Sequence, residues 1–157
     1  MPNIEIDREL VKRLRNKRDA ALRELREIDS VSRPMLDDAD YGLLPTVYEM
    51  FKSLFPDRND CVADVYTRKK FLFVCLCLYS PRTLHGSKIR AGLRDRILAL
   101  LGISCRTAIS DNCRNILTMY EVYRDFRLDV NRTLSHIYRT YPELFAKVGN
   151  GSMINIE

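Results

Sequence analysis

The stretch LLGISCRTAIS, residues 100–110, has the pattern of a helix that ends, a tight turn, and a second helix that begins. Gly102 is typical of the residue just past a helix C-terminus, where the backbone turns left-handed. Ser104 or Thr107 is expected to open the second helix, because a hydroxyl oxygen can cap its free N–H groups. We therefore predict a helical corner over residues 93–114. The remaining question is what such a corner does.

The rest of the chain predicts helices almost throughout. The apolar run Phe71–Tyr79 could be a buried strand by periodicity alone, but the unbroken pattern back to Val62 favours a central helix. The predicted fold is an all-α, compact bundle of about six helices with a short extended C-terminal tail. The helices are expected at 5–29, 45–55, 62–79, 93–101 and 107–141, the last being one long helix or two, with a bend near 128–131.

The chain divides into an N-terminal helical arm (1–33), a helical domain (34–148) and an extended tail (149–157). Apolar residues in the arm form a heptad-like seam of three repeats, interrupted at Arg18: Val11, Leu14, Ala21, Leu25 and Ile28. Such an arm is either a coiled-coil partner or the first helix of the bundle. Three carboxylates follow it, at 37, 38 and 40, and these either solvate a loop or contact a basic neighbour.

Composition excludes several classes of protein. A hydrophobic content of 46% with 30% charged residues fits a globular domain. The longest apolar run is far shorter than the roughly 20 residues that cross a bilayer, and no basic flank adjoins an apolar run near residue 1, so we expect neither a membrane segment nor a signal peptide. The five cysteines lack paired metal-ligand spacing and are interpreted as reduced thiols. No nucleophile, zinc or P-loop motif is present, so we predict no catalytic residue, no metal and no cofactor.

Positive charge is concentrated in one third of the chain. Residues 61–110 carry nine basic and two acidic groups, a net charge of +7, whereas the whole chain carries +5. A local excess of this kind attracts phosphates or an acidic protein surface. The alternative is that these side chains only solvate one face of a helical domain.

The tract Leu93–Ser110 resembles the helix-turn-helix proteins, in which the second helix enters the major groove of DNA. Gly102, Ile103, Ser104 and Thr107 match that pattern, while Leu98 stands where a small residue is usual and the start of the second helix is one residue longer. The resemblance implies double-stranded DNA as the partner, with phosphate contacts from the basic stretch and base contacts from the second helix. The candidate DNA-binding residues are Arg82, Lys88, Arg90, Arg94, Arg96, Arg106, Thr107, Ser110, Asn112 and Arg114.

A wider stretch, Leu76–Arg127, resembles small all-helical proteins of bacterial phages and mobile elements. The residues that carry this likeness are LYSPRTL (78–84), Gly92–Arg94 and YEVYRDF (120–126). It implies an alternative function, a virion or DNA-packaging ring component such as a head–tail connector or a small terminase-like subunit. In such a ring the arm and the tail would contact neighbouring copies.

We therefore predict a non-enzymatic, cytoplasmic protein that binds DNA through residues 82–114. It is expected to form a homo-oligomer, a dimer or a ring, through its N-terminal helix and C-terminal tail. The packaging ring component, located in the host cytoplasm or the virion, is the alternative, and a helical module that binds another protein is a third class.

Overall fold

The chain folds into α-helices joined by short turns, as the computed structural model describes it for residues 7–31, 33–56 and 61–145. Within these ranges it is all-α and contains no β-strand, so the predicted fold class is confirmed. In chain order the elements are α1 (Arg8–Val31), η1 (Asp38–Leu43), α2 (Leu44–Leu54), α3 (Val65–Tyr79), η2 (Pro81–His85), α4 (Leu93–Leu101), α5 (Arg106–Asn112), α6 (Ile116–Val122), α7 (Arg124–Thr140) and α8 (Pro142–Phe145), where η denotes a 3-10 helix.

Helix α3 is the centre of the body, as the unbroken apolar pattern predicted. Nearly every side chain from Lys70 to Tyr79 is buried, and α3 packs against α2, α5, α6, α7 and η2. A helix that is apolar on all sides is stable only when other elements surround it. Its first turn is capped by Asp64, whose carboxylate accepts hydrogen bonds from the Tyr66 backbone N–H (3.0 Å) and the Thr67 hydroxyl (2.5 Å).

The region 107–141 forms three helices, α5, α6 and α7, and the prediction of one or two helices was wrong. Asn115 takes a left-handed backbone conformation with φ of 56° and separates α5 from α6. Tyr123 is extended, with φ of −95° and ψ of 112°, and separates α6 from α7. The helix does not break at 128–131, where a bend was expected, since α7 continues through these residues.

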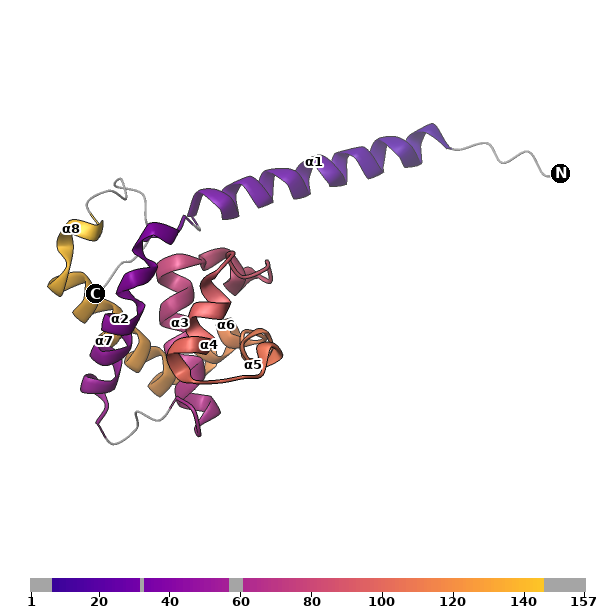
Figure 1. Ribbon diagram of the computed structural model, residues 1–157. Coiled ribbons are helices and arrows are strands. Elements are labelled where there is room, and N and C mark those ends of the chain that lie inside the picture. The colour runs from indigo at the N-terminus through magenta and orange to yellow at the C-terminus, as the bar shows by residue number, and fades with distance from the viewer. Residues whose placement is uncertain (1–6, 32, 57–60, 146–157) are drawn as a thin grey trace.

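Helix α1 projects away from the body as a single long rod (Figure 1). All of its side chains from Arg8 to Glu27 are exposed except that of Ala20, which is half-buried. The N-terminal helix is thus not packed into the bundle. The predicted C-terminal tail, 149–157, lies outside the described residues.

The acidic connector after α1 forms η1 and is anchored to the body. Leu36 and Tyr41 are buried, and Asp37 and Asp40 satisfy each other's backbone N–H groups in a capping box. The Asp38 carboxylate lies 3.7 Å from the Arg90 guanidinium, so the predicted contact with a basic neighbour is present. No helix in the described part of the chain is both long and apolar enough to pass through a membrane.

Candidate functional site

The predicted turn at the end of α4 is present and has a defined hydrogen-bond pattern. Gly102 has φ of 67°, and its N–H donates to the Ala99 carbonyl (3.3 Å). The next N–H, of Ile103, donates to the Leu98 carbonyl (3.0 Å). This is the Schellman arrangement, in which a glycine and a following apolar residue end a helix. It accounts for both the glycine and the isoleucine of the corner.

Helix α5 begins one residue earlier than Thr107 and is capped by neither predicted hydroxyl. Cys105 is the N-cap residue, since its backbone is extended and its carbonyl accepts from the Ala108 N–H (3.2 Å). The hydroxyl of Thr107 instead lies 3.2 Å from the Cys105 sulfur. The prediction that Ser104 or Thr107 caps this helix was therefore wrong.

The two faces of α5 have different environments. Ile109 and Asn112 face the core, and the Asn112 side-chain amide donates to the Ala108 carbonyl, so it is not presented to a ligand. Thr107 and Ser110, three residues apart, form an exposed stripe on the opposite face, and Arg114, in the turn that follows α5, is also exposed.

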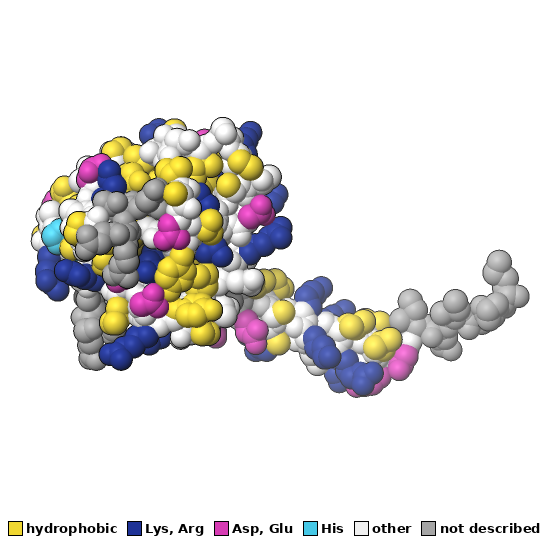
Figure 2. All heavy atoms as spheres, turned by 90° about the horizontal axis from the view of Figure 1, so that it is seen from below, with side chains coloured by type: hydrophobic (Ala, Val, Ile, Leu, Met, Phe, Trp, Pro, Cys, Tyr) yellow, Lys and Arg dark blue, Asp and Glu magenta, His cyan; other side chains and the backbone are white. Residues whose placement is uncertain are grey.

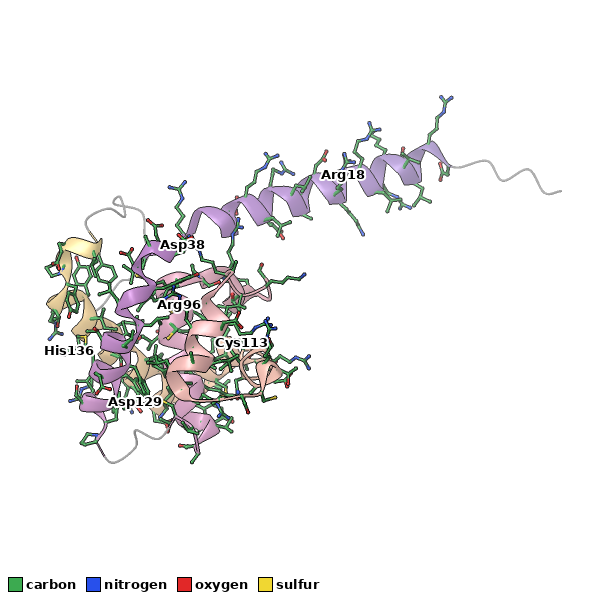
Figure 3. The ribbon with its side chains drawn as sticks, in the orientation of Figure 1. Arg18, Asp38, Arg96, Cys113, Asp129 and His136 are labelled. Atoms are coloured by element: carbon green, nitrogen blue, oxygen red, sulfur yellow. The ribbon has the colours of Figure 1, made fainter. Side chains whose placement is uncertain are left out.

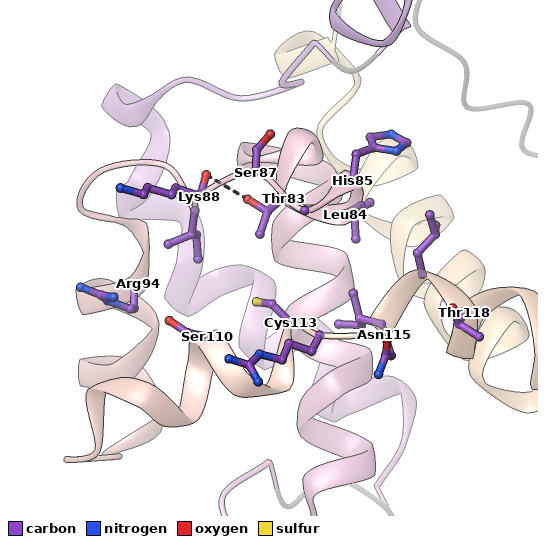
Figure 4. A pocket seen from close by; sticks show the side chains of 15 residues that line it. Thr83, Leu84, His85, Ser87, Lys88, Arg94, Ser110, Cys113, Asn115 and Thr118 are labelled. Atoms are coloured by element: carbon purple, nitrogen blue, oxygen red, sulfur yellow. Dashed lines mark hydrogen bonds between the residues drawn. The ribbon is translucent and has the colours of Figure 1, made fainter. Parts of the chain in front are cut away.

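A cleft of about 830 Å³ lies beside this stripe. One wall is the segment 83–89, which comprises the end of η2 and the loop after it, and the other is the junction of α5 and α6 (Figure 4). Arg94, in the first turn of α4, lines one end. The lining also includes the apolar side chains of Leu84, Ile89 and Ile116.

The cleft is basic. Its lining, within the part of the chain that the structure describes, includes Lys88, Arg94 and Arg114, together with His85, and contains no Asp or Glu. Arg94 is half-buried, and its Nε, which is fully buried, donates to no acceptor in the described part of the chain. Arg114 makes only a loose, exposed ion pair with Asp111 at 3.9 Å, which contributes little to stability. An excess of cations over carboxylates favours the binding of an anion.

The remaining basic candidates lie elsewhere. Arg90 donates to the Leu36 carbonyl (3.1 Å) and holds η1 against the body, and Arg96 lies over the Tyr41 ring at 5.4 Å. These two arginines therefore make structural contacts with the segment around η1. Arg106 is exposed, with its guanidinium 3.4 Å from the Asp95 carboxylate, and Arg82 is exposed on η2. The structure thus brings together Lys88, Arg94, Ser110 and Arg114 and separates Arg90 and Arg96 from them.

Several lining residues were not predicted. Ser87, Asn115 and Thr118 enter the cleft because the chain turns on each side of it, a feature that apolar spacing does not reveal. The only sequence signal for the turn at Asn115 was the residue type, because Asn tolerates the left-handed region better than most residues.

The cysteines differ in environment. All five are free thiols, and burial raises the pKa of Cys77 to about 12 and that of Cys113 to about 11. Cys105 is exposed, and its hydrogen bond with Thr107 lowers its pKa. Among the described residues no group of three or more His, Cys, Asp or Glu side chains is arranged to hold a metal ion.

Comparisons of the chain with models of protein families, with curated proteins and with solved structures found no match. The resemblance to helix-turn-helix proteins rests on the residues of the corner itself.

Proposed function

We propose that this protein binds double-stranded DNA, with the sugar–phosphate backbone along the basic cleft and the exposed stripe of α5 toward the base edges. One observation carries the proposal: Lys88, Arg94 and Arg114 line a cleft that borders the outer face of α5 at Ser110, and its lining within the described residues contains no carboxylate.

Each part of the site has a role in this arrangement. Lys88, Arg94 and Arg114 would neutralise phosphates. Thr107 and Ser110 would lie nearest the bases, where hydroxyls can donate or accept. Asn112 is excluded from base reading by its hydrogen bond to Ala108.

The test is duplex binding measured by fluorescence anisotropy over a series of salt concentrations. The logarithm of the affinity falls with the logarithm of the salt concentration, with a slope of about −0.9 per neutralised phosphate. Arg94→Ala and Arg114→Ala should each reduce the slope by about one. Arg96→Ala is the matched control. It removes the same charge two residues along α4, but the Arg96 side chain lies over the Tyr41 ring and not in the cleft.

Two results would contradict the proposal. One is a wild-type protein with no duplex affinity at low salt. The other is an Arg96→Ala variant whose slope changes as much as that of Arg94→Ala. Far-UV circular dichroism of each variant verifies that the fold is retained.

The alternative function, a phage virion or packaging ring component, is favoured by one observation. Helix α1 stands outside the body with its side chains exposed, as an element that contacts neighbouring copies would. The cleft would then contact packaged DNA without reading its sequence. Native mass distinguishes the two, since a regulator is a monomer or dimer and a connector is a closed ring of many subunits. A cytoplasmic location accompanies the first proposal, and a virion location the second.

A further inference from the structure

Helix α1 exposes an apolar stripe that nothing in the described structure covers. Its large apolar side chains are between 42% and 58% exposed: Leu10, Val11, Leu14, Leu22 and Leu25. Figure 2 shows such side chains among basic ones along the projecting helix. Most of the stability of a protein helix comes from packing an apolar face, so a rod of this kind needs a partner.

Charge along α1 is distributed unevenly. Residues 8–18 carry six basic groups and one acidic group, a net charge of +5. Residues 19–27 carry two basic and three acidic groups, a net charge of −1. Two copies side by side in the same direction would place the +5 halves together. Two copies in opposite directions would place each basic half against the less charged, slightly acidic half of the other.

We propose that α1 pairs with α1 of a second copy of this chain as an antiparallel coiled coil. The seam repeats every seven residues, with Val11, Arg18 and Leu25 in one position and Leu14 and Ala21 in the other. In an antiparallel pair, each layer of the seam sets a residue of the first heptad position on one helix against a residue of the second heptad position on the other helix. The register that places Leu14 against Leu25 of the second copy also places Arg18 against Ala21.

This register explains the one charged residue in the seam. Arg18, midway along α1 (Figure 3), has a side chain that is 68% exposed. In a parallel pair it would meet Arg18 of the other copy, which is repulsive. In the antiparallel pair it meets the smallest side chain of the seam, Ala21, which leaves space for it.

The residues that flank the seam are complementary in the same register. Lys17 lies between the layers of Leu14 and Arg18, and Glu24 lies between those of Ala21 and Leu25. The antiparallel pair therefore sets Lys17 beside Glu24 of the second copy, twice by symmetry. In a parallel pair Lys17 would instead lie beside Leu22, with no charge to match.

The mass of the full-length chain, measured by sedimentation equilibrium, tests the pairing. We expect a dimer that dissociates on dilution. Lys17→Glu and Glu24→Lys should each weaken it by about tenfold, because two attractive pairs become repulsive. The double variant should restore the wild-type affinity. Both residues are exposed on α1, so neither change affects the body.

Cysteine cross-linking tests the direction. In a Cys105→Ser background, Arg18→Cys mixed with Ala21→Cys should form a disulfide-linked dimer, and neither variant should cross-link efficiently alone. Efficient cross-linking of Arg18→Cys with itself would indicate a parallel pair and overturn the proposal. A chain that is monomeric at all concentrations would also overturn it, as would a Leu14→Asp variant of unchanged mass, which would point to another surface or another partner protein.

This inference is independent of DNA binding. The variants of α1 leave the lining of the cleft intact, and the variants of the cleft leave α1 intact. If the chain does not form the proposed dimer, the salt dependence of DNA binding can still be interpreted. If the chain does not bind DNA, the test of the dimer can still be interpreted.

Discussion

A buried lysine of α3 forms an ion pair with α7, and removal of its counter-ion should destabilise the fold. The Lys70 side chain is only 5% exposed, and its Nζ lies 2.8 Å from Asp129 Oδ2 and 3.7 Å from Asp125 Oδ2. It also lies 4.4 Å from the centre of the Tyr66 ring. Asp129→Ala would leave this ammonium group buried without its closest carboxylate.

The magnitude follows from what remains around Lys70. An uncompensated buried charge costs about 3–5 kcal/mol of unfolding free energy. Asp125 and the Tyr66 ring still lie near the ammonium, and a cation–π contact offsets about 0.5–2 kcal/mol of that cost. The difference spans about 1–4.5 kcal/mol, and we expect Asp129→Ala to cost about 2–3 kcal/mol, the middle of that range. Asp125→Ala, which removes the same charge from a side chain that is 56% exposed, should cost at most about 1 kcal/mol.

Urea unfolding followed by far-UV circular dichroism measures both values. In thermal unfolding Asp129→Ala should lower Tm by about 5–10 °C for a chain of this size. The double variant Lys70→Met/Asp129→Leu should recover most of the loss, because it removes both charges and keeps the volume filled. Equal costs for the two aspartate variants would refute the reasoning, and so would a double variant less stable than Asp129→Ala.

Cys105 should be alkylated by iodoacetamide before the other thiols, because its pKa is lowered by the Thr107 hydrogen bond whereas burial raises the pKa of Cys75; equal labelling by mass spectrometry would contradict this. Hydrogen bonds, chiefly from Thr67, lower the pKa of Asp64 in the folded protein. The ionised Asp64 carboxylate therefore stabilises the fold fully above the pKa of the unfolded state, and this stabilisation is lost as pH falls through the folded-state pKa. Asp64→Ala should thus cost about 1 kcal/mol at neutral pH and progressively less in acid, as denaturation at several pH values would reveal. Gly102→Ala should cost about 1 kcal/mol of unfolding free energy through its positive φ alone, since no atom lies within 4 Å of an added Cβ. Gly42 also has open space around an added Cβ but no positive φ, so Gly42→Ala should cost less in the same assay.

The sequence predicted those helices whose ends are marked by residues with strong backbone preferences. Pro45 lies in the first turn of α2, and Gly102 follows α4 at the predicted position. The helical state of α3 followed from an apolar pattern longer than a strand would need. In each case local backbone chemistry and burial favour the same structure.

The breaks within 107–141 could not be predicted from apolar spacing, because the spacing continues across them. Ile109, Ile116 and Phe126 are all buried, although they belong to three helices. Each of the three helices turns an apolar face to α3, so the combined pattern resembles that of one longer helix. The backbone changes direction at Asn115 and Tyr123, where tertiary packing determines the conformation.

The candidate site was partly predictable for a different reason. Residues two apart on a helix point about 200° from one another, since each residue turns the helix by about 100°. Arg94 and Arg96 on α4 therefore face opposite sides, one in the cleft and one over Tyr41. Asn112 follows the buried Ile109 by three residues, which places it on the core face of α5. The spacing of residues along each helix therefore indicates which of these side chains face the cleft, whereas a count of charges along the chain does not.

The cleft depends on two residues with left-handed backbones, one on each wall. Gly86, with φ of 92°, ends η2 and turns the chain into the loop that carries Lys88. Asn115, with φ of 56°, follows Arg114 in the turn after α5 and is the residue before α6, which packs against η2. Both residues line the cleft themselves. If α5 continued as a helix through Asn115, α6 would not return to η2, and Arg114 would not face the loop of Lys88. The concentration of cations that motivates the DNA-binding proposal is therefore produced by two backbone turns, and the net charge of the segment alone would not assemble it.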